Sequence, residues 1–305
     1  MSHLNKILRR ALLPVLTALS VSAAHAFTID FNTGYTDGAT VNAVDDPNVV
    51  GTSTWATAFL AGSTEPSASS VNPAGGTGLA MRISSTTSST TSDRAAINLG
   101  AAGGPVATNE IVFTDPTKLV QVKFDLSLAS GFSGTGGTNI TYVRIGSGFN
   151  MFNSGNWFGI GLDTAGRFVI STKAASTDTG AVSRYVASAY SAFNAANSDY
   201  VDFGSYGSYV TVDLKFDPVA KTYTSLTIGG QDLTSYVGGW FLPTNGTATP
   251  TSELGIMMNA GITATFDIDN IVIQNVSSVP EPSTYAALVG VAALGFVIVR
   301  RRSRL

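Results

Sequence analysis

Alternation of apolar and polar residues is the feature that most constrains the fold of this chain. In the run 120–128, one side would carry Val120, Val122, Phe124, Leu126 and Leu128, and the other Gln121, Lys123, Asp125 and Ser127. A period of two residues is that of a β-strand with one face toward a core and one toward water. The run 210–216 repeats the pattern. Both runs therefore predict half-buried strands.

Further short runs of this kind predict more strands. They are Leu79–Ile83, Ile140–Ile145, Trp157–Leu162, Arg167–Ser171, Tyr223–Ile228 and Leu254–Met258. Turn signals such as Asp217-Pro218 and Gly229-Gly230 separate some of them. Many half-buried strands joined by turns predict an all-β fold, an antiparallel two-sheet β-sandwich.

The last predicted strand changes phase in its middle. Ala264, Phe266 and Ile268 share one phase, and Ile271 and Ile273 share the other. Both sets can be buried only if the strand gains one residue between them, so we expect a β-bulge at Asp269-Asn270.

Some segments lack alternation. Ala181–Ala196 is rich in Ala and predicts either a short helix or a long loop. Three segments rich in Ser, Thr or Gly predict exposed loops: Glu65–Gly78, Ser84–Ser92 and Gly131–Gly137.

The residue types that are missing exclude several kinds of active site. The chain has no Cys, and its two histidines are His3 and His25, in a segment that we expect to be removed. A mature chain without Cys or His cannot form a Ser-His-Asp triad, a Cys-His pair or nearly any zinc site.

The charges are segregated along the chain. Seven of the 17 Lys and Arg residues lie in the two terminal segments, whereas 19 of the 20 acidic residues lie between them. The central part therefore carries a net charge of about −9, which repels phosphate backbones and argues against nucleic-acid binding.

The N-terminus has the pattern of a secretory signal. The basic residues Lys6, Arg9 and Arg10 precede an apolar stretch from Ala11 to Val21 and then Ala24-His25-Ala26. Small residues at Ala24 and Ala26 suit a signal peptidase, which predicts cleavage before Phe27. A retained membrane anchor is the alternative, but the apolar stretch is short for a membrane span.

The C-terminus combines three unlike elements in order. Val279-Pro280-Glu281-Pro282-Ser283 is followed by the uncharged stretch Tyr285–Val299 and then by Arg300, Arg301, Arg302 and Arg304. The apolar stretch predicts a single transmembrane helix, a little shorter than the ~20 residues of a relaxed span. Flanking arginines stay on the cytoplasmic side, so the rest of the chain would face outward.

This order closely resembles the PEP-CTERM sorting signal of bacterial surface proteins. The resemblance implies that a membrane-embedded exosortase recognises Pro280, Glu281 and Pro282 and processes the tail. The two prolines disfavour helix, so we expect an extended and accessible segment. The alternative is a plain single-span anchor with a proline-containing linker.

A looser resemblance concerns the central part. Phe27-Thr28-Ile29-Asp30-Phe31, with Tyr35, Gly38 and Trp55, is similar to the opening of concanavalin A-like or laminin-G-like sandwiches. Phe266–Ile271 is similar to their closing strand, or to that of galactose-binding jelly rolls.

Asp267 and Asp269 are candidate calcium ligands. They lie two residues apart on a predicted strand, so their carboxylates would project from the same face, and paired carboxylates can hold calcium. Resemblance to jelly-roll carbohydrate-binding modules would add Asp30 or Asn32. The alternative is that Asp267 faces solvent while Asp269 and Asn270 form hydrogen bonds at the bulge.

Catalysis on glycosides has little support. A retaining glycosidase needs two carboxyl groups about 5–5.5 Å apart, commonly with a Glu on a strand. The central part has three Glu residues, Glu65, Glu110 and Glu253, and none is evidently paired with another acid. We therefore expect that the protein is not an enzyme.

Aromatic side chains are the candidates for stacking on sugar rings. They are Trp55, Trp157, Trp240, Tyr206 and Tyr209. Trp240 follows Gly238-Gly239, which suggests an exposed turn, so it is the first candidate for glycan binding. For each of these aromatic residues, Trp240 included, burial in the core is the alternative.

These observations predict a signal peptide at 1–26, a β-sandwich at 27–278 and a sorting and anchoring segment at 279–305. We expect an exported, non-catalytic protein, anchored in the membrane and then placed at the cell surface or in the extracellular matrix. The resemblance of the tail implies a link to exopolysaccharide and biofilm. A lectin-like carbohydrate-binding module and a glycoside-active enzyme are the alternatives.

Overall fold

A computed structural model describes most of the central part of the chain. The described residues are 26–41, 55–58, 64–85, 93–100, 105–128, 133–134, 139–146, 156–163, 167–176, 182–188, 207–244, 253–258 and 262–278. Within them, no helix has both the length and the apolar character needed to cross a membrane. The predicted signal peptide before Ala26 and the predicted helix Tyr285–Val299 lie outside these residues.

Within the described residues, nearly all regular structure is β. The elements are β1 (Ala26–Ile29), β2 (Trp55–Ala58), β3 (Thr64–Ser69), the 3-10 helix η1 (Ala74–Gly76), β4 (Ala80–Ser85), β5 (Asp93–Asn98), β6 (Lys118–Leu128), β7 (Ser133–Gly134), β8 (Asn139–Gly146), β9 (Asn156–Asp163), β10 (Arg167–Thr172), β11 (Val182–Ser188), β12 (Tyr209–Asp217), β13 (Thr222–Ile228), β14 (Gln231–Asp232), the short helix α2 (Thr234–Val237), β15 (Glu253–Met258) and β16 (Ile262–Ser277).

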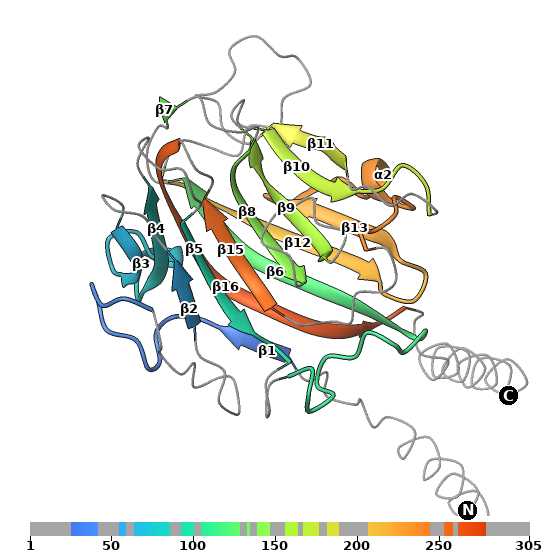
Figure 1. The fold of residues 1–305 in the computed structure, drawn as a ribbon, viewed down its shortest axis with the longest axis horizontal. Helices are drawn as coiled ribbons and strands as arrows, with labels where there is room; N and C mark the ends of the chain where they lie inside the picture. Colours follow the sequence, from blue (N-terminus) through green and yellow to red (C-terminus); the bar gives the residue numbers. More distant parts are fainter. Residues whose placement is uncertain are drawn as a thin grey trace, which may run out of the picture. The chain divides into compact units, whose positions relative to one another are not determined.

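The strands form two antiparallel sheets that lie one over the other (Figure 1). One sheet has the order β14-β13-β12-β6-β16-β4-β3, with β1 and β7 also paired to β16. The other has the order β11-β10-β9-β8-β15-β5-β2. The predicted two-sheet sandwich is confirmed.

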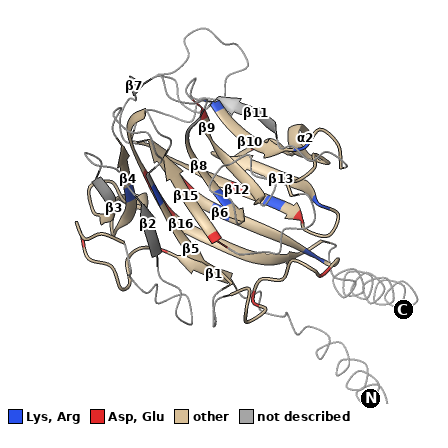
Figure 2. Cartoon of the chain, viewed as in Figure 1, with Lys and Arg blue, Asp and Glu red and all other residues tan. Residues whose placement is uncertain are grey.

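The alternating runs place their apolar residues between the sheets. In the antiparallel pair β6 and β12, Phe124 lies opposite Val212 and Val122 opposite Leu214, all four of them buried. The polar residues of both strands point to the outer face, where all but the buried Ser127 are half-buried or exposed. Charged side chains are sparse on the strands (Figure 2), in keeping with a charged fraction of only 12%.

Aromatic side chains join the two sheets across the core. The ring centroid of Phe216 on β12 lies 6.0 Å from that of Phe158 on β9 and 6.2 Å from that of Phe113. Each fully buried side chain of this size contributes roughly 1.5–3 kcal/mol through removal of apolar surface from water. The core therefore holds the sheets together without disulfides, which a chain lacking Cys cannot form.

Strand β16 occupies the middle of its sheet and changes phase as expected. Ile268 and Ile271 are both buried, and Asn270 between them is exposed with φ 51°. This left-handed conformation, which Asn tolerates better than most residues, accommodates the extra residue between the two apolar sets. One half of the strand pairs with β4 and the other with β1.

Two predictions for irregular segments were wrong in part. The Ala-rich segment 181–196 contains strand β11, paired with β10, rather than a helix or loop over its first half. The segment 65–78 contains most of β3, although it lacks alternating apolar residues. In both cases pairing with a neighbouring strand outweighs the weak local preference of Ala, Ser and Thr.

Candidate functional site

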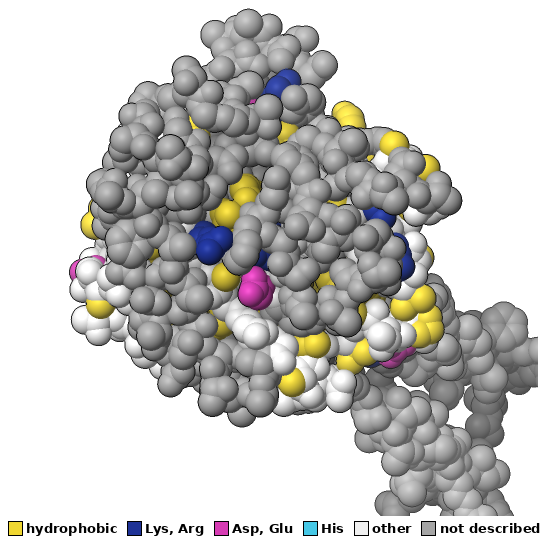
Figure 3. Space-filling model, viewed as in Figure 1, with side chains coloured by type: hydrophobic (Ala, Val, Ile, Leu, Met, Phe, Trp, Pro, Cys, Tyr) yellow, Lys and Arg dark blue, Asp and Glu magenta, His cyan; other side chains and the backbone are white. Residues whose placement is uncertain are grey.

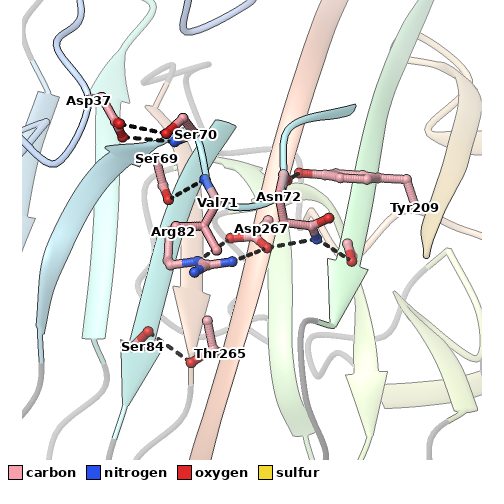
Figure 4. A network of polar contacts seen from close by, with 11 residues as sticks. Asp37, Ser69, Ser70, Val71, Asn72, Arg82, Ser84, Tyr209, Thr265 and Asp267 are labelled. Carbon is pink, nitrogen blue, oxygen red and sulfur yellow. Dashed lines mark hydrogen bonds and ion pairs between the residues drawn. The ribbon is translucent and has the colours of Figure 1, made fainter. Parts of the chain in front are cut away.

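Asp267 is held in an ion pair inside a polar network on the outer face of the larger sheet (Figure 4). It lies on β16 directly opposite Arg82 on β4. Arg82 donates from Nε to Oδ1 at 2.7 Å and from Nη2 to Oδ2 at 2.8 Å, and the Asp267 side chain is only 1% exposed. The hydrogen bond to Asp267 raises the pKa of Arg82, so the guanidinium remains charged.

A loop that we name the strap, residues 70–78, crosses this network. Asn72 donates from Nδ2 to Asp267 Oδ2 at 3.0 Å and to Ser127 Oγ at 3.2 Å. Tyr209 on β12 donates its hydroxyl proton to the Asn72 carbonyl at 2.6 Å. Burial, followed by the nearby Asp267, raises the pKa of Tyr209 and keeps its hydroxyl a donor. The strap thus ties together strands β6, β12 and β16, and the Arg82–Asp267 ion pair joins β4 to β16 (Figure 4).

Asp269 is a second buried carboxylate beneath the strap. Its oxygens accept hydrogen bonds from the backbone N–H groups of Asn270, at 2.8 Å, and Ala74, at 3.2 Å. The pKa of Asp269 is raised to about 6, mainly by burial; the two N–H donors oppose this rise, and the carboxylates of Asp125 and Asp30 add to it. Asp267 and Asp269 share a face, as the strand period requires, but each has its own partners.

This geometry does not fit the predicted calcium site. Both oxygens of Asp267 already accept hydrogen bonds from the Arg82 guanidinium, whose positive charge would repel a metal ion. Asn32 is likewise occupied, because its Oδ1 accepts the Leu79 N–H at 2.8 Å. Among the residues described by the structure, no group of three His, Cys, Asp or Glu side chains is placed to hold a metal. The positive charge beside Asp267 is that of the Arg82 guanidinium.

Trp240, the glycan-binding candidate, is half-buried and packs against the main core cluster. Its backbone N–H donates to the Val237 carbonyl at 2.9 Å, and its carbonyl accepts from Tyr223 at 2.8 Å. It is therefore less exposed than its Gly-Gly context suggests, and its backbone is held in place. Tyr236, one turn earlier in α2, is 61% exposed and was missed, because nothing in the sequence separates its exposed position from the buried position of Val237.

The other aromatic candidates take structural positions or lie outside the description. Trp157 is 6% exposed and its ring lies 5.1 Å from that of Phe113, so it belongs to the core. The Tyr209 hydroxyl is engaged with the strap. The side chain of Trp55, which opens β2, and the whole of Tyr206 lie outside the described residues.

Glu253 is also paired with an arginine. Arg144 Nη2 lies 3.3 Å from Glu253 Oε2 on the neighbouring strand, and burial lowers the pKa of Arg144. The arginine lies flat over Gly255, where a Cβ atom would be 2.9 Å from its Cζ. On the face of the molecule in Figure 3, acidic and basic side chains lie beside one another among hydrophobic ones.

The residues of the predicted processing sites are described only in part. Ala26 opens β1, where it pairs with Gln274. Ala24, the sorting residues Pro280, Glu281 and Pro282, and the arginines Arg300, Arg301, Arg302 and Arg304 lie outside the described residues. The last strand of the sandwich, β16, ends at Ser277, only three residues before Pro280.

Comparison with protein families identifies the tail. Residues 278–302 match the PEP-CTERM protein-sorting motif. This motif marks an exported protein that an exosortase processes, so the predicted sorting signal is confirmed. No curated protein matches the chain.

Comparison with solved structures finds distant similarities to the sandwich. A carbohydrate esterase from the Shiga toxin-encoding bacteriophage phi24B is 18% identical over 73% of this chain and 90% of its own, with a TM-score of 0.40. The family 11 carbohydrate-binding module from Clostridium thermocellum is 13% identical over 83% and 96%, with a TM-score of 0.34. Botulinum neurotoxin type C is 8% identical with a TM-score of 0.44; the match covers 80% of this chain but only 48% of the toxin chain. Similarities at this level do not extend to function.

Proposed function

We propose that this protein is an exported surface or extracellular-matrix component, sorted by an exosortase through its C-terminal tail, with a non-catalytic β-sandwich that associates with extracellular polysaccharide. The observation that carries the proposal is the sorting motif at 278–302, which follows directly after the last strand of the sandwich. A signal peptide at 1–26 would start export, and the segment Tyr285–Val299 would hold the chain in the membrane until processing.

The sorting part is tested in the native envelope by substitution of the Pro-Glu-Pro segment. The triple variant Pro280→Ala/Glu281→Ala/Pro282→Ala should accumulate with an intact tail in the membrane fraction. The matched control is Ser283→Ala/Thr284→Ala, which changes the same short segment outside the motif and should be sorted normally. Intact-mass analysis of the surface and medium fractions gives the answer, and an intact tail on the wild-type extracellular product would sink the proposal.

Support for a non-catalytic body comes from the acids of the described part. Asp267 and Glu253 both lie in ion pairs with buried or half-buried arginines, whereas a glycosidase needs two carboxyl groups that flank the scissile bond. Incubation of the purified sandwich with polysaccharides should release no product. Release of oligosaccharides by the wild type, lost on substitution of an acidic residue, would instead favour the enzyme.

Binding of a polysaccharide through Trp240 is the second candidate function. A ring packed on the core on one side and partly open on the other loses little freedom on binding, which favours stacking on a sugar. Trp240→Ala should reduce retention in a polysaccharide pull-down at least tenfold while the protein stays folded. Val219→Ala, which removes an exposed apolar side chain from the β12–β13 turn, is the matched control and should bind as the wild type does.

A further inference from the structure

The side chain of Asn275 fastens the end of strand β16 to a segment outside the sheets. Its Oδ1 accepts the backbone N–H of Val112 at 2.6 Å, and its Nδ2 donates to the Val112 carbonyl at 2.9 Å. The same Nδ2 also donates to the carbonyl of Leu119, the second residue of β6, at 3.3 Å. One amide therefore satisfies both backbone groups of a residue that belongs to no strand.

The position of Asn275 follows from the phase change earlier in β16. Ile271 and Ile273 point inward after the phase change, and Asn275 continues this series at the border of the core. Val112 lies between Ile111 and Phe113, which are both buried in the core cluster. The segment 111–113 that Asn275 contacts is therefore anchored in the core, so the contact holds the end of β16 in place.

Asn275 lies where the support from β1 stops. The pairing of β1 with β16 ends at Ala26 opposite Gln274, so no β1 residue pairs with Asn275 or the residues after it. From Asn275 to Pro280 there are five residues, a maximum reach of about 17 Å in extended chain. An enzyme that binds the sorting segment as an extended peptide would therefore meet the end of β16 within a few residues.

We propose that Asn275 is a positioning residue that sets the inner limit of tail processing. By holding the strand closed up to Ser277, it leaves only the residues after β16 available as extended peptide, so the processed protein keeps the whole strand. This inference rests on the proposed sorting by an exosortase, because it concerns the boundary of that reaction.

The first test compares the C-termini of mature proteins made in the native envelope from the full chain. The wild-type product should end at Ser278 or later, as determined by intact mass. Asn275→Ala should yield a mixture that includes ends within 274–277. Gln274→Ala is the matched control; it removes one side-chain bond to Gln121 (2.7 Å) from the adjacent residue and should give the wild-type end.

A second measurement reports the contact itself. In hydrogen exchange, the amide of Val112 and those of the strand end should exchange at least tenfold faster in Asn275→Ala than in the wild type, while the amides of Val122 and Phe124 stay protected. This result separates local opening from global unfolding.

The outcomes distinguish the inference from the proposal on which it rests. A wild-type extracellular product that still ends at Leu305 would overturn sorting by processing. A processed wild-type product that ends inside β16, or an unchanged end in Asn275→Ala despite faster exchange, would overturn the positioning role and leave sorting intact.

Discussion

At the scale of single residues, buried carboxylates in this sandwich differ through their partners. Asp267 faces a guanidinium, whereas Asp269 faces backbone N–H groups and the carboxylates of Asp125 and Asp30. Two acids on one face of β16 therefore have different electrostatic surroundings: a cation lies beside Asp267, and other carboxylates lie near Asp269. The difference comes from β4 and the strap, which supply Arg82 to one and Ala74 to the other.

Asp269 should make stability depend on pH in a defined direction. Its pKa of about 6 in the folded protein lies above the ordinary value of 3.8, so folding favours the protonated form. The corresponding stability is present below about pH 4 and is lost as the pH rises through 6. The loss amounts to at most about 3 kcal/mol for this shift.

Asp269→Asn should abolish this contribution of Asp269 to the pH dependence of the free energy of unfolding. In urea unfolding at pH 4 to 7.5, the free energy of unfolding of the wild type should fall relative to that of the variant as the pH rises through 4 to 6. Differences from other acids cancel in this comparison. Parallel curves for the two proteins would show that Asp269 titrates normally in the fold.

At the scale of elements, the phase change in β16 depends on one left-handed residue. Asn270 combines φ 51° with a 2.8 Å hydrogen bond from Nδ2 to Asp125 on the neighbouring strand. Most residue types are strained in this conformation, by roughly 1–2 kcal/mol, whereas Gly is not.

Substitutions at Asn270 should therefore rank by backbone freedom. Asn270→Gly should lose only the hydrogen bond, Asn270→Ala should cost about 1–2 kcal/mol more, and the β-branched Asn270→Val should cost the most. Thr263→Val, on an exposed and regular part of the same strand, is the control. Equal unfolding free energies for the Gly and Val variants would contradict the role of the left-handed conformation.

At the scale of the whole molecule, β16 has more neighbouring strands than any other strand that the structure describes. It pairs with β1, β4 and β7 and neighbours β6, so strands far apart in the sequence meet on it. Strand β16, the last described strand along the chain, thus completes the larger sheet, and the sorting motif follows it in the sequence.

Truncation of the chain at its C-terminal side should show that the fold depends on β16. A chain of residues 27–278 should fold with a free energy of unfolding within about 1 kcal/mol of the mature protein, because the strands end at Ser277. A chain that stops at Ile268 loses the partner of β1 and the contacts of Asn275, and we expect it not to fold. Circular dichroism and urea unfolding of both fragments check this; a cooperative transition in the shorter fragment would contradict it.

The sequence by itself determined the sandwich class, the phase change at Asn270 and the sorting motif, because each is written in contiguous residues. Runs with a period of two residues place their apolar side chains on one face of a strand, whichever strand pairs with it. A short sorting motif can be recognised from its residues before the fold is known. The tertiary structure alone decided the partner of Asp267, the half-burial of Trp240, the strands within 65–78 and 181–196, and the fastening of Asn275. Those features depend on residues distant in the chain: Arg82 is 185 positions from Asp267, and Val112 is 163 from Asn275. Only folding brings such groups within hydrogen-bonding distance, and no local pattern records which of them will meet.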